Sequence, residues 1–250
     1  MEYRPKIVAI FIAYNAETTL EEFWHSFPKE LFHEMILVDD ASQDQTFALA
    51  QKLGIQSYRN HINRGYGGNL KRALDIALQN GAEIIVDIHP DGEYRTSAMV
   101  PALRAIAQGS EFVLGNRFSD FRTPLQNGMY VWKLFPIILL GLLCKMVLRL
   151  PIDDYHQGFR VYTRTLLEKV NYKANADDYR FSFQLLAQAA FHHVKVRQVP
   201  VEVRYTGNKR GASLKNSILY SFQTLEVLCV FLLARLGFPS KIFQKPEGTS

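Results

Sequence analysis

Residues 83–94 read Glu-Ile-Ile-Val-Asp-Ile-His-Pro-Asp-Gly-Glu-Tyr, a short apolar run that leads into polar residues. Such runs are typical of buried strands in α/β sheets, where ligands bind just outside the carboxyl ends of the strands. This run ends in His89, Asp91 and Glu93, and carboxylates at such an edge can hold a divalent cation against a phosphate oxygen. The Pro-Asp-Gly sequence also suits a plain strand-to-turn junction, so the rest of the chain must distinguish the two.

Outward from this run, strand-like and helix-like patterns alternate through the first half of the chain. We expect strands at 6–12, 35–38, 55–58, 83–88 and 112–114, and helices at 17–27, 46–53, 70–78 and 98–107. Repeated strand–helix–strand units predict an α/β fold with a mostly parallel sheet and helices on both faces. Because no internal repeat or low-complexity linker is visible, we predict one domain followed by a C-terminal extension.

The composition is that of an ordinary folded protein, since 48% of the 250 residues are hydrophobic and 21% are charged. It excludes a disordered chain. Cys144 and Cys229 fall in apolar helical stretches without a CxxC or Cys/His cluster, which predicts buried thiols in a reducing compartment. Residues 1–5 lead straight into a strand-like run, so no secretory signal is predicted.

Charge is divided unevenly along the chain. Residues 1–125 carry 12 Lys and Arg against 16 Asp and Glu, whereas residues 126–250 carry 17 against 8. An acidic first half suits metal and base contacts, and a basic second half suits phosphate or an anionic membrane surface, although uneven scatter is the simpler alternative. No helix-turn-helix, RNP or zinc-finger signature occurs, so a nucleic-acid partner is not predicted.

The first of two apolar stretches in the second half is the uninterrupted 11-residue run 134–144. A spanning helix needs about 20 apolar residues, so this run is too short. Because Lys145 and Arg149 share one helical face, we predict an interfacial amphipathic helix over residues 129–150, ended by Pro151.

The second apolar stretch, residues 214–236, has apolar residues at helical spacing with charged residues between them. It divides the chain into a predicted domain at 1–212 and a C-terminal amphipathic helix and tail at 213–250. We predict that both stretches contact a membrane surface and that neither spans it. Packing on the protein's own core or on a partner subunit is the alternative, so a homo-oligomer is possible.

Polar clusters also follow the earlier strands. After the first strand comes Ala13-Tyr14-Asn15-Ala16-Glu17, where the aromatic ring can cover a base and the Asn and Glu can bond base or ribose. A helix start with Asn15 as N-cap is the alternative, and it leaves Tyr14 unexplained.

The second strand ends in Asp39 and Asp40. Adjacent carboxylates repel each other unless a ligand donor or a helix N-terminus offsets them. We therefore take Asp40 as a candidate to accept a hydrogen bond from a base, and Asp44 as a cap of the following helix. A third cluster, Asn-Arg-Gly-Tyr-Gly-Gly-Asn at 63–69, would let backbone approach a ligand closely, but it lacks the P-loop and dinucleotide patterns.

The ordered set AYNAE, ILVDDASQDQT, NRGYGGNLKRAL, HPDGEY, LGNR and DDYHQGFRVY resembles the inverting glycosyltransferase family 2, of GT-A fold. Within that family it is most similar to the dolichyl- and polyprenyl-phosphate sugar transferases. The match covers roughly residues 5–215.

The resemblance implies a role for each cluster. Asp91, as second acid of the family's Asp-x-Asp motif, would hold Mg²⁺ or Mn²⁺ together with His89, and Arg117 would contact the acceptor or leaving phosphate. The implied nucleotide-sugar site comprises Ala13, Tyr14, Asn15, Glu17, Asp40, Gly65, His89, Arg204, Lys209 and Arg210. The implied acceptor side comprises Asp154, His156, Gln157 and Arg160.

Three residues depart from the family pattern. His89 replaces the first acid of Asp-x-Asp, which favours Mn²⁺, although Asp87 should point the same way and could add a carboxylate. Ile12 replaces the usual proline before the Tyr-Asn pair. Ser182 stands where related sequences often have an acid that could serve as general base.

The missing acid bears on the acceptor. A sugar hydroxyl needs its proton removed, whereas a phosphate monoester has its second pKa near 6 and is already largely ionised at neutral pH. We therefore predict sugar transfer from a nucleotide-diphospho-sugar to a polyprenyl phosphate, by an enzyme peripheral to the inner face of the cell membrane. The alternatives are a glycan hydroxyl acceptor in cell-surface polysaccharide synthesis, for which Asp177 or Asp178 could be the base, and an inactive nucleotide-sugar-binding module.

Overall fold

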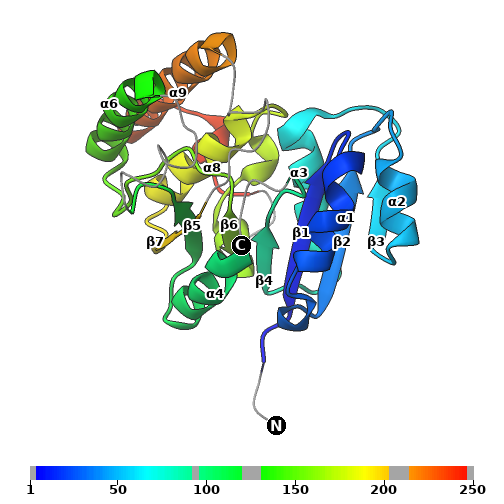
Figure 1. Cartoon of the computed structure of the whole chain (residues 1–250). Coiled ribbons are helices and arrows are strands. Elements are labelled where there is room, and N and C mark those ends of the chain that lie inside the picture. Colours follow the sequence, from blue (N-terminus) through cyan, green and yellow to red (C-terminus); the bar gives the residue numbers. More distant parts are fainter. Residues whose placement is uncertain (1–3, 92–95, 120–130, 203–213, 247–250) are drawn as a thin grey trace.

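A computed structural model describes residues 4–91, 96–119, 131–202 and 214–246. It contains one seven-stranded sheet in the order β3-β2-β1-β4-β6-β5-β7 (Figure 1). The strands are β1 Ile7–Ala13, β2 Glu34–Asp39, β3 Gln56–Arg59, β4 Ile84–Asp87, β5 Phe112–Asn116, β6 Arg160–Thr163 and β7 Val196–Pro200. Only β6 runs antiparallel to its neighbours, so the prediction of a mostly parallel sheet is confirmed.

Helices cover both faces of the sheet, as the alternating pattern predicted. The helices are α1 Glu17–Ser26, α2 Thr46–Lys52, α3 Gly65–Gln79, α4 Met99–Ala107, α6 Val131–Leu148, α7 Arg164–Lys169, α8 Arg180–Phe191 and α9 Leu214–Arg235. Short 3₁₀ turns lie at η1 Lys29–Leu31, η2 Thr96–Ala98, η3 Tyr172–Ala174 and η4 Lys241–Phe243.

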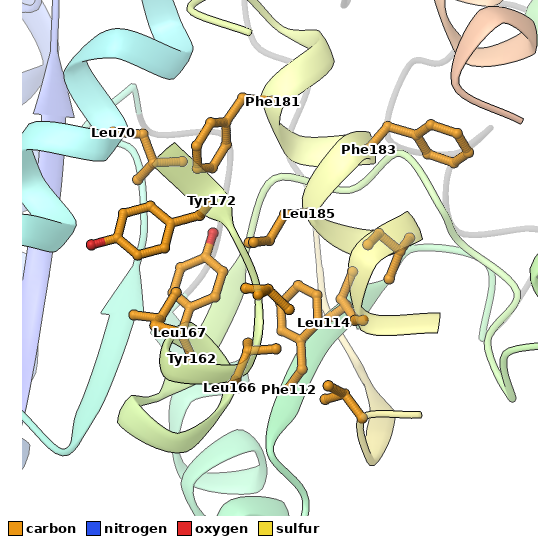
Figure 2. Packing of buried hydrophobic residues seen from close by; sticks show 14 of the residues in the cluster. Leu70, Phe112, Leu114, Tyr162, Leu166, Leu167, Tyr172, Phe181, Phe183 and Leu185 are labelled. Carbon is orange, nitrogen blue, oxygen red and sulfur yellow. The ribbon is translucent and has the colours of Figure 1, made fainter. Parts of the chain in front are cut away.

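Alternation along β1 shows how the two cores arise. Ile10 points to a cluster that includes Leu70 of α3 and Phe181 of α8, whereas Phe11 points to one that includes Phe23 of α1. Successive side chains of a strand face opposite sides, so a fully apolar strand supplies both cores. Figure 2 shows part of the first cluster, in which α8 packs over β5 and β6.

The pattern of the chain did not reveal β6 and β7. Strand β6 begins inside the Gly-Phe-Arg motif and brings Arg160 directly opposite Asp87 of β4. It is only four residues long and starts on a charge, so it lacks the apolar run that marks the other central strands. Its buried Arg160 is tolerated because polar partners surround the guanidinium.

Helices α6 and α9 contact each other and also pack on α8 (Figure 1). Their outward side chains form an exposed apolar surface, hereafter the α6–α9 surface, made of Ile138, Leu139, Leu142, Met146, Ile218, Leu219, Phe222, Leu225, Leu232 and Leu233. Within α9, Ser217–Arg235 is long and apolar enough to cross a membrane, with only 22% of that window buried. Peripheral membrane contact stays a prediction.

The predicted boundary between residues 212 and 213 also stays a prediction. Val227, Leu228 and Phe231 of α9 and Phe243 of η4 nevertheless belong to the same buried cluster as α3 and α8. The thiol of Cys144 is buried, as expected, but the prediction for Cys229 is wrong because its side chain lies on an exposed part of α9.

Candidate active site

One edge of the sheet gathers most of the candidate residues. Asp40 follows β2, Asp87 ends β4 and Arg117 follows β5, and parallel strands end at a common edge. Because β6 is antiparallel, its first residue, Arg160, lies at the same edge. The fold therefore brings together residues that are up to 120 positions apart.

Loops after β1 and β2 form the side predicted to hold the nucleoside. Asn15 has a positive φ of 51°, its N–H donates to Ser42 Oγ at 2.9 Å and its Oδ1 accepts from the N–H of Gln43 at 2.9 Å. Glu17 Oε2 accepts from the N–H of Gln45 at 3.1 Å. Asn15 and Glu17 thus hold the two loops together, while the ring of Tyr14 stays 51% exposed and accessible.

The adjacent acids at the end of β2 are both buried and both satisfied by protein donors. Asp39 accepts from the N–H and the hydroxyl of Ser42 and pairs with Arg59 Nε at 3.2 Å. Asp40 Oδ1 accepts from Asn60 Nδ2 at 2.6 Å and from the N–H of Arg64 at 2.8 Å. These donors offset the repulsion, so the pair of acids does not by itself require a ligand.

The glycine-rich segment serves a contact within the protein. Gly65 has a φ of +75°, and a Cβ there would lie 2.6 Å from the carbonyl oxygen of Asp177. That oxygen accepts from the N–H groups of Gly67 at 2.7 Å and Gly68 at 3.1 Å. The glycines therefore let the segment before α8 approach the N-terminus of α3, in place of the ligand approach that we expected.

Asp87 and His89 lie close together after β4. Asp87 is fully buried, its Oδ2 accepts from Tyr162 Oη at 3.0 Å, and its Oδ1 has no hydrogen-bond partner among the described residues. His89 Nε2 lies 3.9 Å from that Oδ1, and Asp91 is exposed two residues further on. Burial raises the pKa of Asp87, because the charged carboxylate loses its hydration.

These residues form only part of a metal site. No three His, Cys, Asp or Glu side chains in the described parts of the chain converge closely enough to hold an ion. Suitable metal ligands here are Asp87 Oδ1, the imidazole of His89 and the carboxylate of Asp91. This set favours Mn²⁺ over Mg²⁺, because Mg²⁺ prefers oxygen ligands to the nitrogen of an imidazole. An ion here would need further oxygen ligands from a bound substrate.

Ser182, at the position where related sequences often have an acid, lies on α8. Its Oγ is 3.0 Å from Tyr66 Oη, and its carbonyl oxygen accepts from Arg160 Nη1 at 2.6 Å. The ring of Tyr66 contacts His89 edge-on at 5.6 Å and stacks on Tyr179 at 5.0 Å. Sequence reasoning missed Tyr66, whose position within the glycine-rich segment was the available signal.

Both proposed alternative bases are engaged in ion pairs. Asp177 Oδ1 pairs with Lys71 Nζ at 2.9 Å, and Asp178 pairs with Arg180. Arg180 in turn lies 3.4 Å from Glu226 of α9. Neither acid is thereby positioned as a free base.

Arg117 and Asp154 form a bidentate pair on the predicted acceptor side. Arg117 Nε and Nη2 donate to the two carboxylate oxygens at 2.7 and 2.8 Å. Burial alone would raise the pKa of Asp154, but the charge and hydrogen bonds of Arg117 outweigh it and hold that pKa below its usual range. The guanidinium is thus held in a fixed orientation.

The other acceptor-side residues lie around this pair. His156 Nδ1 is 3.2 Å from Tyr220 Oη, and burial lowers the pKa of His156 to about 4. Arg160 Nε and Nη2 donate to the carbonyl oxygen of Gln157 at 3.2 and 3.1 Å. These hydrogen bonds hold the backbone of the loop before β6 in place. The three basic residues Arg204, Lys209 and Arg210 lie outside the described residues.

The profile of glycosyl transferase family 2 matches residues 8–170, from β1 to the end of α7. The chain belongs to glycosyl transferase family 2. The resemblance inferred from the ordered motifs is therefore confirmed.

The names of two relatives refer to phosphates of dolichol or polyprenol. The UDP-N-acetylglucosamine–dolichyl-phosphate N-acetylglucosaminyltransferase of Methanococcus voltae is 23% identical, over 80% of this chain and 86% of that protein. The polyprenol monophosphomannose synthase of Mycolicibacterium smegmatis is 26% identical, over 72% and 69% respectively.

A solved structure shares the fold. Glucosyl-3-phosphoglycerate synthase from Mycobacterium tuberculosis, in complex with Mn²⁺, UDP and glucosyl-3-phosphoglycerate, has a TM-score of 0.66 and 21% identity. The match covers 95% of this chain and 82% of that one. The seven-stranded sheet with helices on both faces is thus the GT-A fold of family 2 glycosyltransferases.

Proposed function

We propose that this family 2 enzyme is an inverting, metal-dependent transferase that moves one sugar from a nucleotide-diphospho-sugar to a polyprenyl phosphate. The observation that carries the acceptor assignment is the place of Ser182. Position 182 carries a hydroxyl, which lies 3.0 Å from Tyr66 Oη, so this position supplies no carboxylate to deprotonate a sugar hydroxyl. An ionised phosphate oxygen needs no base, only cations that position it.

Tyr14, Glu17 and Asp40 are the residues we assign to the nucleoside. Tyr14 offers an exposed ring, and Asn15 and Glu17 join the loops after β1 and β2. Asp40 accepts hydrogen bonds from Asn60 and Arg64. Ala13 completes that side, whereas Gly65 is engaged in the contact with Asp177. Arg204, Lys209 and Arg210 would close over the diphosphate.

His89 and Asp91, with Asp87 beneath them, are the residues we assign to Mg²⁺ or Mn²⁺. When bound, the ion would neutralise charge on the leaving diphosphate. The structurally similar glucosyl-3-phosphoglycerate synthase contains Mn²⁺ and UDP together, which supports an ion shared between protein and nucleotide.

Arg117, oriented by Asp154, would hold the acceptor phosphate. An oxygen of that phosphate attacks the anomeric carbon from the side opposite the diphosphate. The bond to the diphosphate breaks, and the nucleotide leaves with the bonding electrons. His156, Gln157 and Arg160 support the acceptor side of this arrangement.

The α6–α9 surface supports the proposal that the enzyme binds to the membrane, where a polyprenyl phosphate resides. Its exposed apolar side chains and the basic second half suit a peripheral position on the inner, cytoplasmic face of the cell membrane.

The purified protein, incubated with a panel of nucleotide-sugars and a polyprenyl phosphate, should form a glycosylated lipid detectable by mass spectrometry. Asp91→Ala should abolish the product, because it removes the most exposed ligand candidate. Glu168→Ala, which removes an exposed carboxylate on α7, is the matched control and should keep full activity.

Three outcomes would contradict the proposal. Full activity of Asp91→Ala would reject the site assignment. A product formed only with soluble glycan acceptors would indicate the hydroxyl-transfer alternative, and nucleotide binding without turnover on any acceptor would indicate an inactive module.

A further inference from the structure

His156 connects the acceptor side to the C-terminal helix. Its ring lies 5.6 Å from that of Phe183 on α8 and contacts the ring of Tyr220 on α9 edge-on at 5.2 Å. Its Nδ1 lies 3.2 Å from Tyr220 Oη. The other ring nitrogen, Nε2, is out of solvent and has no hydrogen-bond partner among the described residues.

The backbone of His156 is hydrogen-bonded to both members of the Arg117–Asp154 ion pair. Its carbonyl oxygen accepts from Arg117 Nη2 at 3.3 Å, and its N–H donates to Asp154 Oδ1 at 3.4 Å. A shift of the imidazole would therefore move the loop that orients the guanidinium.

The protonation states of His156 and Tyr220 follow from their surroundings. Burial lowers the pKa of His156 to about 4; Asp154 opposes this lowering, and Arg117 and Arg160 reinforce it. At neutral pH the ring is uncharged and carries one hydrogen. Burial also raises the pKa of Tyr220 to about 12, so its hydroxyl keeps its hydrogen.

Hydrogen-bond chemistry then selects one tautomer. A phenol hydroxyl is a better donor than acceptor, whereas the unprotonated nitrogen of imidazole is a strong acceptor. The favoured arrangement has Tyr220 Oη donating to Nδ1, which leaves the single ring hydrogen on Nε2. A buried N–H without a partner costs free energy unless a ligand or water accepts from it.

We propose that Tyr220 is a positioning residue that holds His156 in the Nε2–H tautomer, so that this N–H donates to a phosphate oxygen of the acceptor. The inference rests on the proposed function and extends it by assigning α9 a role in the active site. Ile218, Leu219 and Phe222, on the same stretch of α9, belong to the α6–α9 surface. One helix would then contact the lipid surface and orient the group that binds the lipid's phosphate.

The decisive variant is Tyr220→Phe, which keeps the ring and its packing and removes only the hydroxyl. The KM for polyprenyl phosphate should rise about 3- to 10-fold, as expected for one lost hydrogen bond, with kcat and the KM for the nucleotide-sugar nearly unchanged. Thr224→Val is the matched control, since it removes a hydroxyl one turn away that donates to the carbonyl of Tyr220, and it should leave all three parameters unchanged.

Nitrogen-15 NMR of His156 tests the tautomer without any turnover. Wild-type protein should show a protonated Nε2 and an unprotonated Nδ1, and Tyr220→Phe should lose this preference. Titration with inorganic phosphate should shift the Nε2 resonance in the wild type. A second variant pair compares the two nitrogens, because the amide of glutamine mimics Nε2 and that of asparagine mimics Nδ1. His156→Gln should preserve the acceptor KM better than His156→Asn.

Three results would overturn the proposal: a hydrogen on Nδ1 in the wild type, an unchanged tautomer in Tyr220→Phe, or an effect of that variant on the nucleotide-sugar KM alone. Because the NMR signature needs no lipid product, an incorrect acceptor assignment would leave the tautomer intact. The two failures are therefore distinguishable.

Discussion

Buried polar side chains at the carboxyl edge of the sheet depend on individual partners. Arg160 is accommodated by the carbonyl oxygens of Gln157 and Ser182, and Asp154 by the fork of Arg117. Each such partner satisfies a group whose burial would otherwise cost free energy. At this scale the properties of a residue follow from its neighbours, as the lowered pKa of His156 illustrates.

The pH dependence of stability should reveal the state of His156. Its pKa is about 4 in the folded protein, against about 6.5 in an unfolded chain. Between these values the unfolded chain binds a proton that the folded protein does not, so this contribution to stability falls as pH falls. From pH 7 to pH 5, the free energy of unfolding should drop by about 1–2 kcal/mol more in the wild type than in His156→Gln.

Urea titrations of both proteins at both pH values measure this difference, in which the contributions of other titrating groups cancel. An equal drop in the two proteins would mean that His156 is not held neutral by the fold.

Single elements are positioned by close backbone contacts. The N-terminus of α3 donates to the carbonyl of Asp177, and this contact brings the segment before α8 against the glycine-rich segment. Tyr66 of α3 and Ser182 of α8 meet as a result. The glycines were predicted from their spacing as a ligand-approach loop, but sequence spacing does not show which backbone will approach.

The substitution Gly67→Ala should therefore disrupt the contact between α3 and the segment before α8. A Cβ at this position would lie 2.3 Å from the carbonyl oxygen of Ala176 and 2.8 Å from Phe181 Cβ, so the segment would have to move. The variant should lose about 1–3 kcal/mol of unfolding free energy in a urea titration.

Gly141→Ala in α6 is the matched control, because the nearest atom to its new Cβ is 3.7 Å away. Alanine favours a helix interior, so this control should be as stable as the wild type or slightly more stable. Unchanged stability of Gly67→Ala would show that the contact between α3 and the segment before α8 is loose.

At the scale of the whole molecule, the neighbouring helices α6 and α9 both carry exposed apolar side chains. The two helices contact each other on the side of the sheet where the carboxyl ends of β5 and β7 lie (Figure 1). The described residues that we assign to the nucleotide-sugar and to the acceptor lie at this same edge. A membrane bound at the α6–α9 surface would present its phosphate groups near the acceptor side.

Binding to anionic lipid vesicles, measured by sedimentation, tests this arrangement. The double variant Leu219→Glu/Phe222→Glu should bind at least about tenfold more weakly, because each large apolar side chain contributes roughly 1.5–3 kcal/mol when buried. Ile62→Glu, at an exposed apolar residue outside that surface, should bind like the wild type. Equal binding of the double variant would place the membrane contact elsewhere.

The sequence by itself determined the α/β class, the first five strands and the family, because apolar runs and ordered motifs are local properties of the chain. It also identified most residues at the edge of the sheet, since strand ends can be read from where an apolar run stops. Only the tertiary structure decided that β6 runs antiparallel between β4 and β5, that protein donors satisfy Asp39 and Asp40, and that Tyr220 meets His156. These contacts join residues distant in sequence, and their partners are selected by packing of the whole chain.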